Sequence, residues 1–406
     1  MRKTLGLEVD ITGLPESPKP PDADPIKDLL TPRVLREPAT IRARLRERGD
    51  AWWSPTLDSW VTAGLAETTA VLRDADRFCS DWRRLGEDTP DSSLSVQALD
   101  APEHTAVRQV LVGAFRAQDW AGIEKRTVAS VNERLAKLAR RSSFDFVGDF
   151  AAPLALEAVT NLLGVDPPDL DRFGPVSAAI VDAMDDGLRP ETAEPGTAAR
   201  AELAELTGSW LTDAANHRGR DGMVDYLAAH HDGVSRTVLR NSLRVILHSG
   251  YESSSRLLGN ALVACLDAPG ALARLRGGVT DAALRELVRF AGPVQAEARG
   301  CVEDTEVGGQ PIRRGEVVTV LVGVANRDPR VFAYPDTLDL DRQHNPHIGF
   351  GRGPHACLGS LPALLLTRTV FTALVREHPG MEPVGEPIFR RNATLRGVEH
   401  LELRLR

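Results

Sequence analysis

Hydrophobic residues recur at helical spacing along most of the chain, from about residue 67 to residue 292. Examples are Val107, Val110 and Leu111, and further on Leu156, Val159 and Leu163. Two loops rich in Asp, Glu, Pro, Ser and Thr interrupt this pattern at 85–101 and 185–199. Long loops of this kind often cover a pocket, so we expect both to lie beside a binding site.

Strand patterns are confined to the two ends of this helical region. Aromatic and β-branched residues at 52–53 and 60–62 flank a turn-prone segment and predict a hairpin. The apolar run at 317–324 predicts a buried strand, and residues 358–377 predict one more helix. The whole pattern predicts a mainly helical fold with small β-sheets.

One predicted helix is long enough to cross the molecule. Its apolar stripe runs through 243–265, in a segment of roughly 30 residues. Gly250 lies within it, and the hydroxyls of the serines at 253–255 can bond backbone carbonyls. We expect a local distortion that opens a groove there, and the alternative is an exposed polar patch.

The composition is that of a globular protein with a large core. Of its 406 residues, 42% are hydrophobic and 26% are charged, which excludes a disordered or fibrous chain. The formal net charge of −8 argues against nonspecific binding to nucleic acid. The four cysteines are too far apart in sequence for a zinc site or a dense disulfide framework. Cysteines without such a framework are typical of a protein in a reducing compartment.

The N-terminal segment differs from the rest of the chain. Its five prolines disfavour a helix, so we expect an extended segment over 1–30 and a single domain over 31–406. The first ten residues carry no apolar stretch, and the run at 317–325 is far shorter than the roughly 20 residues that span a bilayer. We therefore expect neither a signal peptide nor a membrane anchor.

The most informative segment is HIGFGRGPHACLGSL, residues 347–361, which leads into the last predicted helix. Gly351 and Gly353 allow backbone angles that other residues resist, so the chain can loop tightly against a flat or bulky group. Cys357 then lies near a helix N-terminus, where free N–H groups and the helix dipole stabilise a thiolate, the form that binds metal. The alternative is a small buried hydrophobe.

This segment resembles the heme-binding signature of the cytochrome P-450 monooxygenases, Phe-Gly-x-Gly-x-His-x-Cys-x-Gly, at every fixed position. The matching residues are Phe350, Gly351, Gly353, His355, Cys357 and Gly359. The resemblance extends over about residues 35–406 and implies the triangular, mainly α cytochrome P-450 fold with heme b as cofactor. It makes Cys357 the axial thiolate of the iron, a ligand that favours O–O cleavage. Phe350 would then pack beside the sulfur, and His355 would contact a heme propionate.

Other motifs of the family follow in order. His104 and Arg108, in DAPEHTAVR, are similar to its His-x-x-x-Arg element, and Arg299 matches another arginine. By the resemblance these three would bind the heme propionates, since cationic donors suit carboxylates. Taken singly, each would more often be a surface charge.

The resemblance also implies a structural ion-pair network. Glu286 and Arg289 match the family's Glu-x-x-Arg pair, at a spacing that places both side chains on one helix face. Residues 325–342 look like the meander segment of the family, in which Arg342 would complete the network. Alone, a pair of this spacing is usually a solvated surface contact.

The run at 249–254 resembles the distal pattern Ala-Gly-x-Glu/Asp-Thr-Thr/Ser. By that resemblance Glu252 is the acid and Ser253 the alcohol that deliver protons to iron-bound dioxygen. Serine keeps the hydroxyl of the usual threonine and loses the methyl group that restricts its rotamers. Ser249 replaces the usual alanine and adds a second hydroxyl. A further departure lies at 362–366, where a proline and leucines stand in place of the family's arginine, which puts the choice of redox partner in doubt.

Substrate contacts are expected from the loops 85–99 and 175–199 and from two short stretches. The candidate residues are His248, Tyr251, Val294, Gln295 and Glu297. Side chains at 248, 251 and 297 could bond a polar substrate, and an ordinary surface role is the alternative for each.

The resemblance implies a cytoplasmic, monomeric monooxygenase that binds neither nucleic acid nor membrane. It would take electrons from a separate ferredoxin and ferredoxin reductase, activate O₂, and hydroxylate or epoxidise a small organic substrate in natural-product tailoring. Two alternatives remain. The same heme could catalyse ring closure or C–C or C–O coupling, or the chain could be a non-catalytic helical binding protein whose cysteine is structural.

Overall fold

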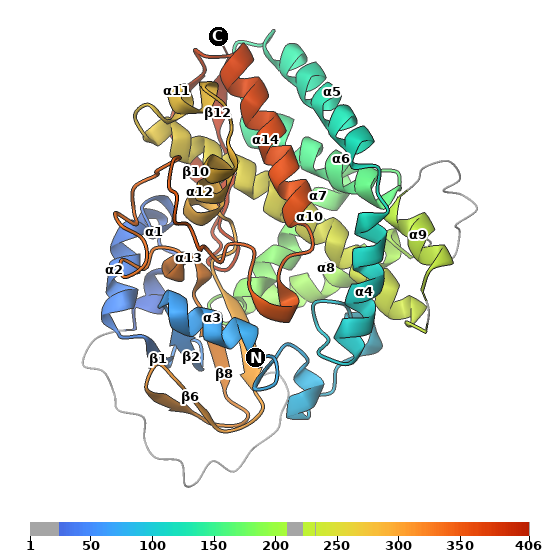
Figure 1. Cartoon of the computed structure of the whole chain (residues 1–406), viewed down its shortest axis with the longest axis vertical. Helices are drawn as coiled ribbons and strands as arrows, with labels where there is room; N and C mark the ends of the chain where they lie inside the picture. Colours follow the sequence, from blue (N-terminus) through green and yellow to red (C-terminus); the bar gives the residue numbers. More distant parts are fainter. Residues whose placement is uncertain (1–23, 209–221, 232, 406) are drawn as a thin grey trace.

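A computed structural model describes residues 24–208, 222–231 and 233–405 of the chain. Helices make up most of it, as the hydrophobic pattern predicts (Figure 1). The longer helices are α4 (Glu103–Arg116), α5 (Trp120–Leu138), α6 (Ala152–Leu163), α7 (Leu170–Asp182), α8 (Ala193–Leu206), α10 (Arg236–Asp267), α12 (Asp281–Ala291) and α14 (Ser360–Glu377). The shorter ones are α1 (Pro32–Arg36), α2 (Ala39–Glu47), α3 (Leu65–Arg73), α9 (Met223–Ala229), α11 (Ala271–Arg276) and α13 (Val322–Ala325).

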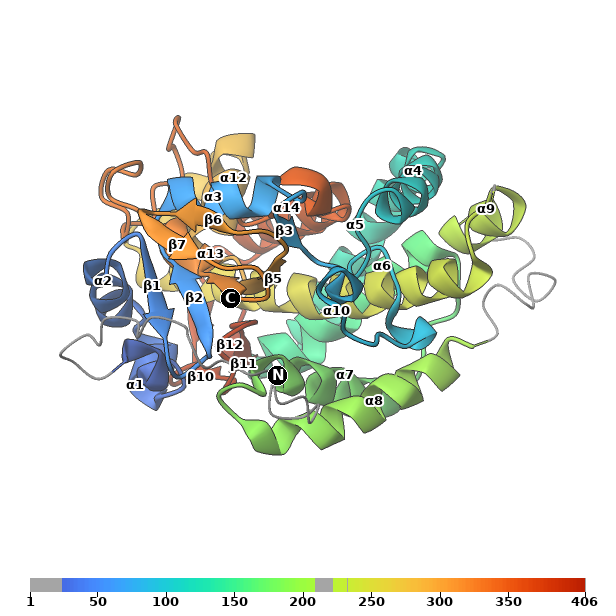
Figure 2. The same ribbon diagram turned by 90° about the horizontal axis from the view of Figure 1, so that it is seen from below.

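Helix α10 is the central element of the fold. Its 32 residues cross the molecule behind α14, and Figure 2 shows the same helix running alongside α6. Its first half packs in one hydrophobic cluster with α4, α6 and α7, and its second half packs in another with α14. The site described below lies beside the middle of α10, where the two clusters meet.

The larger sheet carries one side of the site. Its strand order is β1 (Ala51–Ser54), β2 (Ser59–Thr62), β8 (Val317–Val320), β5 (Glu297–Cys301) and β3 (Phe78–Cys79). The predicted hairpin is confirmed, because β1 and β2 pair antiparallel with Trp53 opposite Trp60. Strand β8 joins β2 in parallel and β5 antiparallel, which brings the C-terminal part of the chain against the hairpin.

Three smaller sheets complete the β structure. They pair β6 (Thr305–Val307) with β7 (Gln310–Ile312), β10 (Ile388–Phe389) with β11 (Val398–His400), and β12 (Glu402–Arg404) with both β4 (Phe144–Asp145) and β9 (Glu382–Pro383).

Some predicted boundaries are wrong. The strand predicted over 317–324 ends at Val320, and the rest of the apolar run forms the buried helix α13. A fully buried apolar run satisfies either structure, so its pattern alone does not separate the two. The loop predicted over 185–199 ends early, since α8 begins at Ala193. The extended segment predicted over 1–30 lies outside the described residues up to residue 23, and Pro25–Asp28 form a 3-10 helix.

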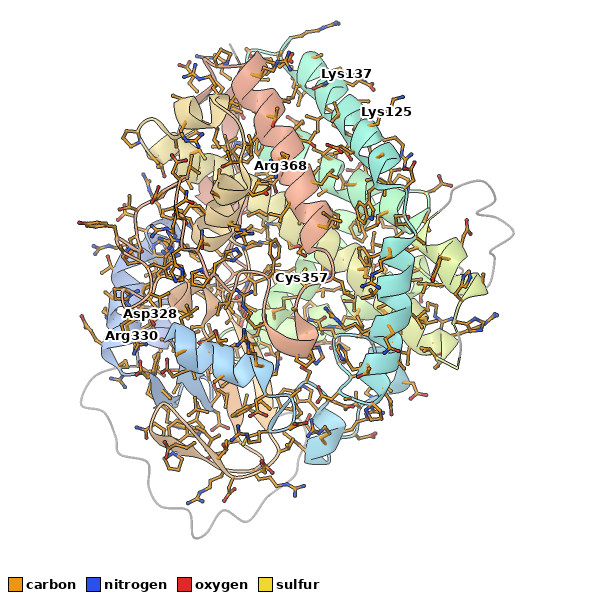
Figure 3. The ribbon with its side chains drawn as sticks, viewed as in Figure 1. Lys125, Lys137, Asp328, Arg330, Cys357 and Arg368 are labelled. Carbon is orange, nitrogen blue, oxygen red and sulfur yellow. The ribbon has the colours of Figure 1, made fainter. Side chains whose placement is uncertain are left out.

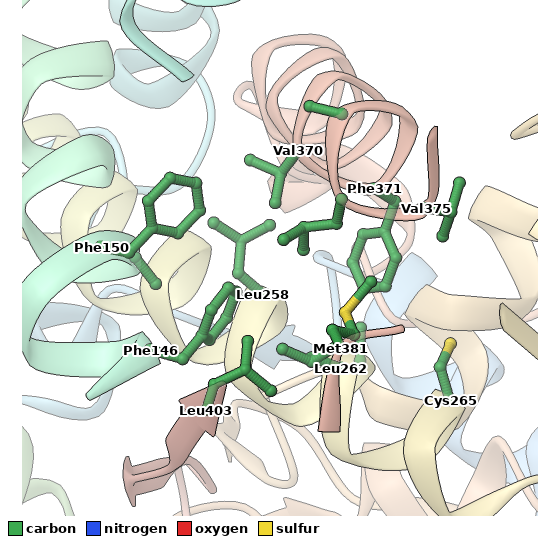
Figure 4. Close-up of a cluster of buried hydrophobic side chains, with 14 of the residues drawn as sticks. Phe146, Phe150, Leu258, Leu262, Cys265, Val370, Phe371, Val375, Met381 and Leu403 are labelled. Atoms are coloured by element: carbon green, nitrogen blue, oxygen red, sulfur yellow. The ribbon is translucent and has the colours of Figure 1, made fainter. Parts of the chain in front are cut away.

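The main hydrophobic core lies between α14, the second half of α10 and the π-helical turn Phe146–Ala151 that leads into α6. Figure 4 shows Phe146 and Phe150 from that turn, Leu258 and Leu262 from α10, and Phe371 from α14 in contact there. Phe146, Phe150 and Phe371 are fully buried. This packing fixes the angle between α10 and α14 and so holds the start of α14 in place.

One helical stretch, Phe146–Leu163, is long and apolar enough to cross a membrane by length and composition. In the structure 61% of it is buried, and Phe146, Phe150 and Leu163 have no exposed surface. A core helix of a globular protein gives the same signal, so this stretch is explained by the packing just described.

Candidate functional site

The segment that precedes α14 forms a tight loop around Cys357 (Figure 3). The Cys357 N–H donates to the carbonyl of Phe350 at 2.8 Å, which closes the loop. Gly351 and Gly353 both have left-handed backbone angles, with φ of 68° and 73°. A Cβ on Gly353 would lie 2.4 Å from the carbonyl oxygen of Leu72, at the end of α3. Glycine at 353 is therefore required by both the backbone angle and the close approach of α3.

Helix α14 begins at Ser360, so Cys357 lies just outside its N-terminus. The first intrahelical hydrogen bond is donated by the Ala363 N–H to the Gly359 carbonyl at 3.1 Å. Pro362 therefore occupies a first-turn position whose N–H would have no helical partner in any case. Pro362 therefore leaves the start of α14 intact.

The electrostatics of the Cys357 thiol are a balance of opposing effects. Burial raises the pKa of the Cys357 thiol, and the Gly359 N–H and the Arg108 guanidinium act in the opposite direction. Cys357 is nevertheless an exposed residue, whereas Cys79, Cys265 and Cys301 are buried. Burial raises the pKa of those three thiols to about 11, 12 and 11. All four cysteines lie in the described residues, so Cys357 alone offers its sulfur to an external ligand.

Two histidines and an arginine lie beside the cysteine loop. The ring of His104, on α4, lies 4.2 Å from the ring of His355 in the loop. Arg108, one turn further along α4, donates from Nη2 to the carbonyl of Ala356 at 2.6 Å. Burial, then the positive charges of His355 and Arg108, lower the pKa of His104 to about 4. Its Nε2 is buried and has no hydrogen-bond partner in the described part of the chain.

Arg299, on β5, is the third cationic side chain expected at the site. Its Nη2 lies 2.8 Å from Oε2 of Glu297, and its Nη1 donates to the Ala298 carbonyl at 2.8 Å. The Glu297 carboxylate itself faces the cysteine loop, since Oε1 would lie 3.9 Å from a Cβ on Gly351. The sheet thus presents an ion pair to the same loop that α4 contacts from another side.

Two serines lie on one exposed face of α10. Ser249 donates to the Val245 carbonyl and Ser253 donates to the Ser249 carbonyl, each at 2.6 Å. The expected distortion does not break α10, which continues unbroken through Gly250. A Cβ on Gly250 would lie 2.8 Å from the side chain of Val159 on α6, so this glycine permits close helix packing.

Glu252 lies on a different face of α10 from Ser253. It is 4% exposed and accepts a hydrogen bond from Nε of Arg256 at 2.9 Å. Burial raises the pKa of Glu252, but the charges of Arg256 and His248 outweigh that effect and lower it. Glu252 is therefore an ionised carboxylate held within the protein.

The predicted substrate contacts have partners of their own. His248 Nε2 lies 3.2 Å from the Ser177 carbonyl, and Tyr251 packs edge-on against Phe173, with ring centroids 5.0 Å apart. Burial raises the pKa of Tyr251 to about 12. Gln295 donates from Nε2 to the Gly292 carbonyl at 2.7 Å. Val294 forms an isolated antiparallel bridge with Leu395. Residues near 395 therefore lie beside the predicted substrate contacts, and the sequence did not predict them.

The structure joins the three residues expected in the ion-pair network. Arg289 donates to both carboxylate oxygens of Glu286 at 2.7 Å, and Arg342 Nε donates to Oε2 at 3.1 Å. Asn345 also donates to Oε2, at 3.1 Å. Glu286 has no exposed surface, so this group fixes the meander segment behind the cysteine loop.

Comparison with known proteins identifies the family. The chain is 32% identical over 361 residues to nocardicin C N-oxygenase of Nocardia uniformis subsp. tsuyamanensis, across 85% of this chain and 89% of that one. The chain belongs to the cytochrome P-450 family. The family profile "Cytochrome P450" matches residues 199–379. This cytochrome P-450 is therefore a monooxygenase with heme b as its cofactor.

Solved structures show the same fold. The ligand-free structure of CYP164A2 from Mycobacterium smegmatis matches with a TM-score of 0.85 and 26% identity, over 94% of this chain and 99% of that one. A second structure, of cytochrome P-450-like monooxygenases involved in microbial secondary metabolism, matches with a TM-score of 0.79 and 26% identity. That match covers 87% of this chain and 95% of the other. The predicted cytochrome P-450 fold is confirmed.

The residues present in this cytochrome P-450 fit a heme. An accessible sulfur lies at a helix N-terminus, which suits a thiolate ligand. The unpartnered Nε2 of His104 and the guanidinium of Arg108 lie beside it on α4, where they suit the carboxylates of a porphyrin. The left-handed backbone at Gly351 and Gly353 lets the loop fold tightly around the sulfur.

Two residues that contact these groups were missed from the sequence. Asp100 accepts a hydrogen bond from His355, and Arg256 binds Glu252. Asp100 is the first residue of the motif DAPEHTAVR, four positions before His104. This spacing was the one sequence signal that could have placed Asp100 near the site. Arg256 follows Glu252 at the i, i+4 spacing typical of a helical ion pair.

Proposed function

We propose that this cytochrome P-450 is a heme-thiolate enzyme in which Cys357 would be the iron ligand and a small organic substrate would bind beside α10. The observation that carries the proposal is the exposed Cys357 sulfur at the start of α14, within a loop that α4 flanks with His104 and Arg108. The unpartnered Nε2 of His104 supports a carboxylate ligand beside that loop.

The chain's residues take distinct roles in binding the cofactor. The Phe350 carbonyl accepts the Cys357 N–H and so would hold the sulfur in place as the ligand of the heme iron. Gly359 offers its N–H to the thiolate, which favours the charged form of the ligand. His104, Arg108 and Arg299 flank the loop that carries His355, and these four side chains would bind the propionates.

When bound, the heme supplies reductive activation of O₂. In a hydroxylation, a C–H bond and O₂ take up two electrons and two protons and give an alcohol and water. The protons reach the site along the exposed face of α10, where the Ser253 hydroxyl donates and accepts in turn. Arg256 and His248 keep Glu252 ionised, so this carboxylate can relay a proton that it accepts from the interior but holds none of its own.

The substrate is a natural product or its precursor. Supporting this are a relative named for the N-oxygenation of nocardicin C and a structural neighbour involved in microbial secondary metabolism. The electrons come from a ferredoxin and its reductase in the cytoplasm. The start of α14 offers the exposed Leu361 to such a partner, next to the stretch 362–366 that lacks the family's arginine.

Spectral screening followed by turnover tests this proposal. A substrate that displaces water from ferric heme shifts the Soret absorption, so a library of terpenoids, polyketides, peptides and aromatic compounds can be sorted by that shift. The best compound is then incubated with ferredoxin, reductase and ¹⁸O₂. We expect a product with one labelled oxygen. A product that lacks two hydrogens and any label would establish oxidative coupling instead, and the absence of a Soret band would refute the proposal.

A further inference from the structure

Asp100 is a buried carboxylate that no role described so far uses. It is 5% exposed and lies between β3 and α4. Its oxygens accept the N–H of Ser80 at 3.1 Å, the N–H of Asp81 at 3.2 Å and Nη1 of Arg84 at 3.2 Å. The fourth donor is Nε2 of His355 at 3.2 Å, which lies 255 residues away in sequence.

The carboxylate of Asp100 is charged. Burial raises the pKa of Asp100, but the hydrogen bonds from His355, from the Asp81 and Ser80 N–H groups and from Arg84 outweigh it, so the pKa falls to about 2. A charged acceptor forms stronger hydrogen bonds than a neutral one. The charged Asp100 carboxylate therefore holds its hydrogen-bond donors, His355 among them, more strongly than a neutral acceptor would.

His355 is held on two sides. Asp100 binds one ring nitrogen, and the ring of His104 lies against the ring at 4.2 Å and 38°. The His104 N–H donates to the Asp100 carbonyl at 2.8 Å, so Asp100 also fixes the start of α4 through its backbone. The unpartnered Nε2 of His104 remains for a ligand, and among the described residues no hydrogen bond engages the second ring nitrogen of His355.

We propose that Asp100 is a positioning residue for the heme. Its carboxylate orients the His355 imidazole toward a propionate and ties the cysteine loop to the segment 80–81, which leads into the loop expected to line the substrate pocket. The inference rests on the proposed function, because it takes His355 as a propionate contact. Asp100 would thus act on the cofactor through His355, without touching the heme itself.

The test is the rate at which the ferric holoenzyme gives up heme to an excess of apomyoglobin. Asp100→Asn keeps the shape and one carbonyl acceptor and removes the charge. We expect heme loss about tenfold faster, which corresponds to about 1.4 kcal/mol. Asp81→Asn is the matched control, because Asp81 is also buried on this segment and its carboxylate binds Arg83 instead of the cysteine loop. Its heme loss should change less than twofold.

A double-mutant cycle separates positioning from general stability. If Asp100 acts through His355, then Asp100→Asn accelerates heme loss less than twofold when His355→Phe is already present. The same tenfold acceleration in both backgrounds would overturn the proposal, because Asp100 would then act only through Ser80, Asp81 and Arg84. The propionate bending bands in the resonance Raman spectrum give a second readout, and they should shift in Asp100→Asn but not in Asp81→Asn.

Failure of this inference can be told from failure of the proposed function. If the reduced wild-type protein shows a thiolate-ligated carbon monoxide spectrum and Asp100→Asn loses heme at the wild-type rate, only the role of Asp100 is refuted. If Asp100→Asn does not fold, Asp100→Glu keeps the charge and displaces the carboxylate by one methylene. It should also lose heme several times faster, and a wild-type rate would overturn the proposal.

Discussion

The carboxylate of Glu252 and the guanidinium of Arg256 form a buried ion pair one helical turn apart on α10. Nε of Arg256 donates to Oε2 at 2.9 Å, and Nη2 lies 2.9 Å from the same oxygen. The side chains are 5% and 3% exposed, and Nη1 of Arg256 donates to the Leu395 carbonyl at 3.0 Å. The acid expected to deliver protons is therefore anchored to the C-terminal part of the chain.

Removal of the Glu252 charge should destabilise the protein strongly. Glu252→Gln leaves Arg256 buried without its counter-charge, which costs about 3 to 5 kcal/mol in comparable pairs. Glu133→Gln is the control, since Glu133 and Lys137 form a pair of the same spacing with 67% and 71% exposure. That exposed pair is screened by water, so its loss should change the free energy of unfolding far less. Urea unfolding measures the free energy of unfolding of both variants. Similar losses of stability in Glu252→Gln and Glu133→Gln would contradict the account of the buried pair.

Ser253 should control how much oxygen is used productively. Ser253→Ala removes the hydroxyl that bonds the Ser249 carbonyl, and we expect product formation with O₂ to fall by ~10²-fold while hydrogen peroxide accumulates. Product formation driven by added peroxide should change little, because that route brings its own protons. Ser253→Thr restores the hydroxyl with a restricted rotamer and should raise the product yield above wild type. Equal losses by both routes would show that Ser253 serves only the structure.

Gly353→Ala should prevent the cysteine loop from closing. A Cβ at 353 would lie 2.4 Å from the Leu72 carbonyl oxygen, at a φ of 73°. Gly385→Ala is the matched control, because Gly385 has a φ of 84° and nothing within 4 Å of the added carbon. We expect Gly353→Ala to be purified with little heme. Gly385→Ala should keep its heme and lose about 1 kcal/mol of stability. Full heme content in Gly353→Ala would contradict the assigned loop packing.

His347 should make the protein less stable in acid. Burial, then the charges of Arg352, Arg285 and Arg289, lower the pKa of His347 to about 4. The unfolded chain binds a proton at the ordinary histidine pKa of about 6.5, so stability is fully present above that value and falls as the pH drops toward 4. His347→Asn can still accept the Gly349 N–H and cannot titrate. Between about pH 6.5 and about pH 4, His347→Asn should lose about 2 kcal/mol less of its free energy of unfolding than wild type. Parallel plots of unfolding free energy against pH for the two proteins would refute the prediction.

The sequence was most informative where the physical requirement is local. Helical spacing predicts most of the helices, and the left-handed glycines of the cysteine loop follow from its motif. Partners distant in sequence were not predictable. The bond between His355 and Asp100 depends on how α4 packs against the loop, which no spacing records. Glu252 illustrates the same limit, because only the packing around α10 shows that it is turned toward Arg256 and away from Ser253.

The most direct test of the account is the carbon monoxide spectrum of the reduced protein. Wild type and Cys301→Ala should both show the red-shifted Soret band that a thiolate opposite carbon monoxide produces. Cys301 is buried and its thiol donates a hydrogen bond to the Glu303 carbonyl, so it is not available to the iron. Cys357→Ala should lack that band. If Cys357→Ala kept it unchanged, the sulfur bound to iron would be another residue and the site assigned to this chain would be wrong.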